Sequence, residues 1–327
     1  MSGAYSFSRS ELEATAQLVH AHMPATPAYA WPLMSERAGA EVWVKHENHT
    51  PIGAFKVRGG IVYMDELVRH GARVNGVITA TRGNHGQSIA LAATAVGVAS
   101  TILVPHGNSV EKNAAMRSFG ARLIEHGRDF DEAKAEAARL AQAEGLHMVP
   151  SYHPALVKGV ATYALELFDA AGALDAVYVP IGMGSGISGL IAARDALGLS
   201  TEIVGVVADA APAVAMSFEA GRAVSTNSAA TFADGMACRE PDADAIAVML
   251  RGAAAIVRVS EDEIADAIRL IYETTHNVAE GAGAAAVAAM LKDHRRKRGA
   301  RLGVILSGGN VDRPVLTRVL SGETPPS

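Results

Sequence analysis

Short apolar runs typical of strands alternate with helical stretches along nearly the whole chain, and this alternation most constrains the fold. Several runs are continuously apolar, as expected for parallel strands that helices cover on both faces. The pattern therefore predicts an α/β fold with right-handed crossovers between parallel strands. The expected strands are residues 42–45, 76–79, 101–104, 122–124, 176–179, 203–207 and 302–306. The expected helices are residues 59–69, 85–96, 130–144, 154–168, 187–197, 261–274 and 283–292.

Composition fits this class and excludes several others. The length of 327 residues suggests about two domains, and 49% hydrophobic residues can build a sizeable core. The net charge of −5 gives no electrostatic reason to expect nucleic acid or an anionic membrane as a partner. The single cysteine, Cys238, excludes an internal disulfide and a multi-cysteine metal site. We therefore expect a reduced, cytoplasmic setting.

Three local segments bear on targeting and on helix ends. The first six residues lack a basic region followed by an apolar run, so no signal peptide is expected. Ser10 and Glu13 predict a capping box that opens a helix. Residues 88–105 carry no charge, but they are rich in small residues and Gly97 interrupts them. We expect a buried helix to about residue 96 and then a strand, rather than a membrane span. The basic run 294–298 is expected to be a solvated helix end.

A glycine-rich turn, Gly-Met-Gly-Ser-Gly-Ile-Ser-Gly at 182–189, lies between an expected strand and an expected helix. Backbone N–H groups at such a junction bind phosphate. Residues 184–189 also match the dinucleotide fingerprint, and Asp209 follows at a distance suited to a ribose. The loop alone therefore leaves two alternatives open, a nicotinamide cofactor and a single phosphate monoester such as that of pyridoxal phosphate.

Three further segments carry polar groups that suit a ligand. Lys56 lies between Phe55 and Val57, and apolar surroundings lower the pKa of a lysine and favour a Schiff base. Residues 81–87, Thr-Arg-Gly-Asn-His-Gly-Gln, follow a strand and open a helix, which suits a carboxylate or a phosphate. Residues 307–310, Ser-Gly-Gly-Asn, follow a third strand. Because ligands lie at the carboxyl ends of parallel strands, these turns are expected at one edge.

Two other segments are weaker candidates. His46 and His49 flank Glu47, but this spacing is not a recognised zinc set, and no metal site is expected there. Residues 280–283, Glu-Gly-Ala-Gly, form a further turn before an alanine-rich helix, which either contributes to the site or only packs.

Taken together, the chain resembles the fold type II pyridoxal-phosphate enzymes, specifically the threonine/serine dehydratase and serine racemase family of the tryptophan synthase β-like superfamily. The matching segments occur in family order and are residues 26–27, 42–48, 53–59, 83–87, 182–186, 233–235 and 307–310. The resemblance implies two open parallel-sheet domains with helices on both faces and the cofactor in the cleft between them. It implies a large domain of residues 1–75 and 148–327 and a small domain of residues 76–147.

The resemblance also implies a role for each site residue. Lys56 would bind the cofactor as a Schiff base and act as the catalytic base, with Phe55 against the ring. Asn84 would bond the ring hydroxyl, and Ser307 would face the pyridine nitrogen. Phosphate would be held by the loop residues Gly182, Met183, Gly184, Ser185 and Gly186. The substrate carboxylate would be held by the loop Thr81, Arg82, Gly83, Asn84 and His85.

The implied reaction is α,β-elimination, in which a lyase of amino-acid degradation converts a β-hydroxy amino acid to a 2-oxo acid and ammonia. Threonine, serine, phenylserine and hydroxyaspartate all remain open as substrates, and a homodimer is implied. Arg82 stands where the racemases carry a serine base, so little racemase activity is expected. Val207, Ala211 and Ala213 stand where the racemases hold a divalent metal, so none is expected. A nicotinamide oxidoreductase, a racemase and a non-enzymatic amino-acid sensor are the alternatives.

Overall fold

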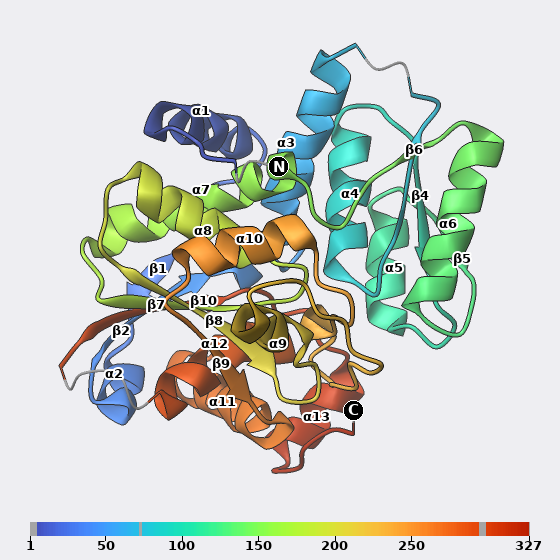
Figure 1. The fold of residues 1–327 in the computed structure, drawn as a ribbon. Helices are drawn as coiled ribbons and strands as arrows, with labels where there is room; N and C mark the ends of the chain where they lie inside the picture. The colour runs from blue at the N-terminus through green and yellow to red at the C-terminus, as the bar shows by residue number, and fades with distance from the viewer. Residues whose placement is uncertain (1–4, 72–73, 294–298, 327) are drawn as a thin grey trace.

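The computed structural model describes residues 5–71, 74–293 and 299–326, which fold around two β-sheets flanked by helices (Figure 1). The larger sheet has the strand order β1-β2-β10-β7-β8-β9, and the smaller sheet has the order β5-β4-β3-β6. The larger sheet consists of β1 (Ala28–Ala30), β2 (Glu41–His46), β7 (Ala176–Pro180), β8 (Glu202–Ala208), β9 (Ala255–Val259) and β10 (Arg301–Leu306). The smaller sheet consists of β3 (Val77–Ala80), β4 (Ser100–Val104), β5 (Arg122–Glu125) and β6 (His147–Met148). The predicted α/β class is confirmed.

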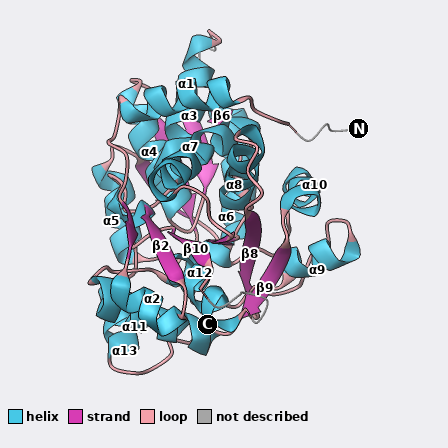
Figure 2. Ribbon diagram, turned by 90° about the vertical axis from the view of Figure 1, so that its left-hand side faces the viewer, coloured by secondary structure: helices cyan, strands magenta, loops and turns pink. Residues whose placement is uncertain are grey.

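Helices pack on both faces of the larger sheet. Along β10 the side chain of Val304 packs into one apolar cluster and that of Ile305 into another, on the opposite face. Figure 2 shows the larger sheet between α7 and α8 on one side and α11 and α13 on the other. The helices before and within the smaller sheet are α1 (Arg9–His20), α2 (Pro32–Ala38), α3 (Lys56–Arg69), α4 (Asn84–Ala95), α5 (Val110–Ser118) and α6 (Phe130–Glu144). Those after it are α7 (Pro154–Ala171), α8 (Ser185–Ala196), α9 (Ala213–Ala220), α10 (Ala243–Gly252), α11 (Glu261–Thr275), α12 (Gly281–Lys292) and α13 (Arg313–Leu320). Two 3-10 turns, η1 (Glu47–His49) and η2 (Asp234–Met236), complete the set.

The larger sheet departs from the predicted parallel arrangement at one edge. Strand β1 pairs antiparallel with β2, with Ala28 opposite Lys45, whereas the other strand pairs of this sheet are parallel. The physical reason is the connection, because a parallel pair needs a crossover of about a dozen residues or more. Helix α2 has only seven residues and the chain turns back after it.

The first helix begins two residues earlier than predicted. Ser8, not Ser10, is the N-cap, and its side chain accepts a hydrogen bond from the Glu11 N–H while the Glu11 carboxylate accepts one from the Ser8 N–H. The capping box therefore uses Glu11 in place of Glu13. The two candidates overlap in sequence, and only the extended backbone of Ser8 decides between them.

The uncharged stretch 88–105 divides as predicted between a helix and a strand. Helix α4 ends at Ala95 and strand β4 begins at Ser100, with the turn at Gly97 between them. Among the described residues, no helix combines the length and the hydrophobicity that a membrane crossing requires. The basic run 294–298 lies outside the described residues.

Helices α3 and α7 pack so closely that their backbones touch. A Cβ atom at Gly59 would lie 2.8 Å from the carbonyl oxygen of Leu156, and one at Gly159 would lie 2.3 Å from that of Arg58. Only glycine permits this approach at both positions. The contact matters because the smaller sheet is one continuous stretch of chain, which is entered from α3 and left towards α7.

Candidate active site

A cavity of about 470 Å³ opens at the carboxyl ends of β3, β7 and β10, with residues of both sheet regions in its walls. This is the edge at which parallel α/β sheets bind ligands. All the site residues predicted from the sequence line it, although their roles stay predictions. They are Phe55, Lys56, Thr81, Arg82, Gly83, Asn84, His85, Gly182, Met183, Gly184, Ser185, Gly186 and Ser307.

Lys56 is the first residue of α3, three residues before the predicted start of that helix. Its Nζ donates a hydrogen bond to Ser185 Oγ at 3.1 Å and lies 4.9 Å from the centre of the Phe55 ring. The main chain before Lys56 is tied to the turn after β10, because the Phe55 N–H donates to the Ser307 carbonyl at 3.0 Å. Burial lowers the pKa of Lys56 from 10.5 to about 8. A large fraction of the amine is therefore neutral and nucleophilic near pH 8.

This pKa predicts how Lys56 reacts in the protein without any ligand. The rate of acylation of Lys56 by acetic anhydride should rise with pH and level off above about 8, because only the neutral amine reacts. Mass spectrometry of the modified peptide measures this rate beside that of Lys134, an exposed lysine at the rim of the same cavity. A Lys56 rate that still rises tenfold per pH unit at pH 9.5 would contradict the prediction.

The glycine-rich turn after β7 forms one wall of the cavity. Helix α8 begins at Ser185, and its N-cap Gly184 has a φ of 99°, a backbone angle that residues other than glycine rarely adopt. Space excludes a side chain at Gly182, where a Cβ atom would lie 2.2 Å from the carbonyl oxygen of Gly235. The unpaired N–H groups at the helix start, together with its dipole, favour an anion such as a phosphate.

A second helix start faces the same cavity. Helix α4 begins at Asn84 directly after the turn at Thr81 and Gly83, and the Gly83 N–H donates to Thr81 Oγ1 at 3.0 Å. The neighbouring His85 is uncharged near neutral pH, because burial and the nearby Lys56 lower its pKa to about 3. Two helix N-termini therefore converge on one cavity, and each can hold an anionic group.

The amide of Asn84 is held by two partners that the sequence did not reveal. Its Nδ2 donates to Glu280 Oε1 at 2.6 Å, and its Oδ1 accepts from Asn310 Nδ2 at 2.8 Å. Glu280 is buried at the cavity wall, so its turn contributes a side chain to the site and does not only pack. Lys112 of α5 lies 3.5 Å from Glu280 and 3.3 Å from Asp234.

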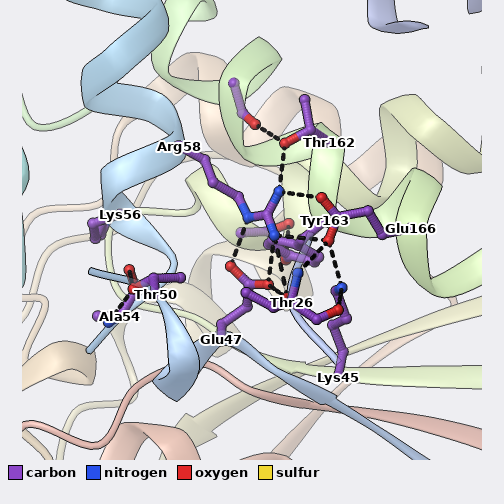
Figure 3. A network of polar contacts seen from close by, with 12 residues as sticks. Thr26, Lys45, Glu47, Thr50, Ala54, Lys56, Arg58, Thr162, Tyr163 and Glu166 are labelled. Carbon is purple, nitrogen blue, oxygen red and sulfur yellow. Dashed lines mark hydrogen bonds and ion pairs between the residues drawn. The ribbon is translucent and has the colours of Figure 1, made fainter. Parts of the chain in front are cut away.

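Arg58, two residues after Lys56, anchors α3 in a buried ionic network (Figure 3). Its Nε donates to Glu47 at 2.7 Å, and its Nη1 donates to Glu166 at 2.6 Å and to Thr162 at 2.9 Å. Burial alone would raise the pKa of Glu166, but the hydrogen bond and charge of Arg58 outweigh burial and hold that pKa near 2. The network joins α3 to η1 and α7.

The alternative sites are not supported. Asp209 is exposed and absent from the cavity lining, so it does not complete a dinucleotide site there. Glu47 is engaged by Arg58 and Thr26, and His46 Nε2 accepts a hydrogen bond from Trp31, so neither stands free beside His49. Within the described ranges, no three His, Cys, Asp or Glu side chains gather as a metal site would require.

Comparison with known protein families decides the cofactor. A family model described as pyridoxal-phosphate dependent enzyme matches residues 19–308. The chain belongs to this family. Its cofactor is therefore pyridoxal phosphate (PLP), and not the nicotinamide alternative. The cavity fits this group, since it offers three features that suit PLP. These are a partly neutral lysine amine, a helix N-terminus preceded by a turn in which Gly182 leaves no room for a side chain, and the neutral hydroxyl of Ser307.

Relatives with curated names are ammonia-lyases and dehydratases. The chain is 34% identical over 290 residues to L-threonine ammonia-lyase of Thermotoga maritima, covering 88% of this chain and 72% of that protein. It is 32% identical to L-threo-3-hydroxyaspartate ammonia-lyase of Saccharomyces cerevisiae, covering 91% of each. It is 34% identical to the biosynthetic L-threonine dehydratase of Salmonella typhimurium, of which it spans 56%.

Solved structures confirm the fold type II architecture. Threonine deaminase isoform 2 of Solanum lycopersicum superposes with a TM-score of 0.86 at 29% identity, covering 97% of this chain and 94% of that one. Maize serine racemase superposes with a TM-score of 0.89 at 25% identity, covering 97% and 98%. Neighbours of both reaction types thus share the fold, and the fold alone does not choose between elimination and racemisation.

Proposed function

We propose that the chain is a PLP-dependent ammonia-lyase, which converts a β-hydroxy amino acid to a 2-oxo acid and ammonia. One observation carries this proposal, namely that the Lys56 amine lies in one cavity with two separate helix N-termini. One helix start would hold the cofactor phosphate and the other the substrate carboxylate. The names of the relatives in Thermotoga and yeast support elimination from a β-hydroxy amino acid.

Each cofactor-binding residue has a physical reason for its role. The N–H groups of Gly182, Met183, Gly184, Ser185 and Gly186 would bind the phosphate. Asn84 keeps one N–H for the ring hydroxyl, because Glu280 takes only the other. Phe55 would pack against the ring, since it already lies beside the Lys56 amine. PLP, when bound, supplies an electron-withdrawing ring that weakens the Cα–H bond of the amino acid.

Lys56 and Ser307 would set the direction of the reaction. The Lys56 amine, with its pKa of about 8, would take the Cα proton. Ser307 presents a neutral hydroxyl rather than a carboxylate, which would leave the pyridine nitrogen uncharged and make the ring a weaker electron sink. That favours loss of a β-hydroxyl over reactions that need a long-lived carbanion. One water leaves in the elimination and one is consumed when ammonia is released, so the atoms balance.

Ammonia release from a substrate panel tests the proposal. The cofactor-loaded protein is incubated with both enantiomers of threonine, serine, phenylserine and threo-3-hydroxyaspartate. Ammonia and 2-oxo acid are both measured, and they should form in equal amounts. We expect turnover of at least one substrate and none of the matching amino acid without a β-hydroxyl. Bound cofactor with no ammonia from any substrate would overturn the proposal and favour an amino-acid sensor.

Arg82 is expected to limit racemisation. Its guanidinium lies at the cavity wall, 3.9 Å from Asp234, and has no acceptor atom, so it offers no second base beside Lys56. Since a positioned base is worth about 10²–10⁴-fold, racemisation of L-serine should be at least about 10²-fold slower than its elimination. Chiral chromatography of the remaining serine measures this, and comparable rates would contradict it. Arg82→Ser should increase the share of racemisation.

The organisation into domains and subunits belongs to the same proposal. The stretch 76–147 would form a small domain around the smaller sheet, and residues 1–75 and 148–327 would form a large domain around the larger sheet. We also propose a homo-oligomer, supported by the exposed Tyr29 on the edge strand β1 and the exposed Leu33 on α2. Light scattering of the purified protein tests the subunit number.

A further inference from the structure

A chain of polar contacts runs from Lys112 on α5 to the amide of Asn84. Lys112 Nζ lies 3.5 Å from Glu280 Oε2, and Glu280 Oε1 accepts from Asn84 Nδ2 at 2.6 Å. The two oxygens of one buried carboxylate therefore connect a lysine to the proposed partner of the cofactor's ring hydroxyl. Glu280 follows α11 and belongs to the larger-sheet region, while Lys112 and Asn84 belong to the smaller-sheet region.

The orientation of the Asn84 amide depends on this chain. Asn310 Nδ2 donates both to the Ile52 carbonyl at 2.7 Å and to Asn84 Oδ1 at 2.8 Å. An ionised Glu280 only accepts hydrogen bonds, so it must face the NH₂ side of Asn84. With both sides assigned, the free N–H of Asn84 has a fixed direction into the cavity. A neutral residue at position 280 would weaken the hydrogen bond on the NH₂ side and leave Asn310 as the main partner that holds the amide.

Lys112 is the cation that lies beside the buried Glu280 carboxylate. Burial raises the pKa of Glu280, while Lys112 opposes that rise through its charge and through a hydrogen bond. Lys112 is itself nearly buried, with 7% of its surface exposed. Its aliphatic stem packs against Gly83, where a Cβ atom would lie 2.9 Å from Lys112 Cδ. Asp234, the second carboxylate beside Lys112, completes the group of charges.

We propose that Lys112 is a positioning residue, which holds the Glu280 carboxylate in place and thereby fixes the Asn84 amide towards the ring hydroxyl of PLP. This rests on the role proposed above for Asn84. Because Lys112 comes from the smaller-sheet region and Glu280 from the larger, contact between the two regions would set the hydrogen bonding of the cofactor. A merely structural ion pair would join the regions without acting through Asn84.

A double-mutant cycle separates these two roles. The variants are Lys112→Met, Asn84→Ala and the double variant, with Lys158→Met as the matched control, since Lys158 pairs with Glu66 and is absent from the cavity lining. PLP is titrated into each cofactor-free protein, and the dissociation constant and the visible spectrum of the bound cofactor are recorded. Thermal unfolding without cofactor reports the fold of each variant.

We expect Lys112→Met to weaken PLP binding about tenfold, the size of one hydrogen bond involving a charged group. In the Asn84→Ala background the same change should cost less than about twofold, because the interaction it supports is already gone. Lys112→Arg should restore most of the affinity, and Lys158→Met should leave it unchanged. Equal losses in both backgrounds would overturn the proposal.

Glu280→Gln provides a second route if Lys112→Met does not fold. Glutamine keeps the shape but removes the charge, so we expect the same loss of affinity and the same spectral change as in Asn84→Ala. Wild-type affinity and spectrum in Glu280→Gln would overturn the proposal. These readouts need no turnover, so a protein that binds PLP in this way but releases no ammonia would refute only the proposed lyase activity.

Discussion

Replacing Lys56 by alanine should lower kcat for ammonia release at least about 10³-fold, the largest catalytic loss expected from a single substitution in this chain. The reason is that one amine would serve twice, as the covalent anchor of the cofactor and as the base for the Cα proton. Its position supports both uses, since Nζ lies 3.1 Å from Ser185 Oγ in the turn proposed to bind the phosphate, and the amine has a pKa of about 8.

Borohydride reduction shows whether the loss comes from the anchor. In the wild-type protein, reduction followed by peptide mapping should place the cofactor on Lys56. The Lys56→Ala variant should bind PLP without fixing it, and Lys134→Ala should behave as the wild type, because Lys134 is an exposed lysine at the rim. Cofactor fixed on another lysine, or a Lys56→Ala variant with near-normal turnover, would show that the assignment is wrong.

Replacing Arg58 by methionine should lower the free energy of unfolding by about 3–5 kcal/mol, the usual cost of removing one partner of a buried ion pair. Arg58 and Glu47 are both fully buried, so the variant would leave the Glu47 carboxylate short of its counter-charge. Urea unfolding of the cofactor-free protein measures the change without a contribution from ligand binding.

Two further variants sharpen the stability prediction. Arg9→Met removes an exposed ion pair with Glu13 and should leave the urea midpoint nearly unchanged, because exposed ion pairs contribute little to stability. The double variant Arg58→Met with Glu47→Gln should recover part of the loss, because the uncompensated charge is gone. An unchanged urea midpoint in Arg58→Met would mean that the network does not stabilise the fold.

The strands that line the site could be predicted because they are continuously apolar. Strands β3, β7 and β10 are buried between helices, and this leaves a signal in the sequence. Strand β9 was missed because it lies at a sheet edge, is only half-buried along most of its length and contains Arg258. Strand β1 was missed because its three residues are half-buried or exposed, and so carry no apolar run.

The site residues divide in the same way. Glycines and polar residues at strand ends were predictable, since the rule on carboxyl ends of parallel strands brings them together. Lys112 was not, because it lies on the polar helix α5 and looks in sequence like any solvated lysine. The role of Arg58 could not be predicted either, because its partner Glu166 is 108 residues away and only the packing of α3 on α7 makes them meet.

The backbone contact between α3 and α7 also bears on whether the smaller-sheet stretch could be replaced by that of a relative. The inserted smaller sheet leaves from one of these helices and returns to the other, so its two junctions lie on a single packed unit. A graft of this stretch from a relative would carry its own versions of Thr81, Arg82 and Lys112, while Lys56 and the phosphate-binding turn stay behind. The proposed anchor of the cofactor and the proposed carboxylate-binding loop thus lie on two different stretches of the chain, which such a graft would separate.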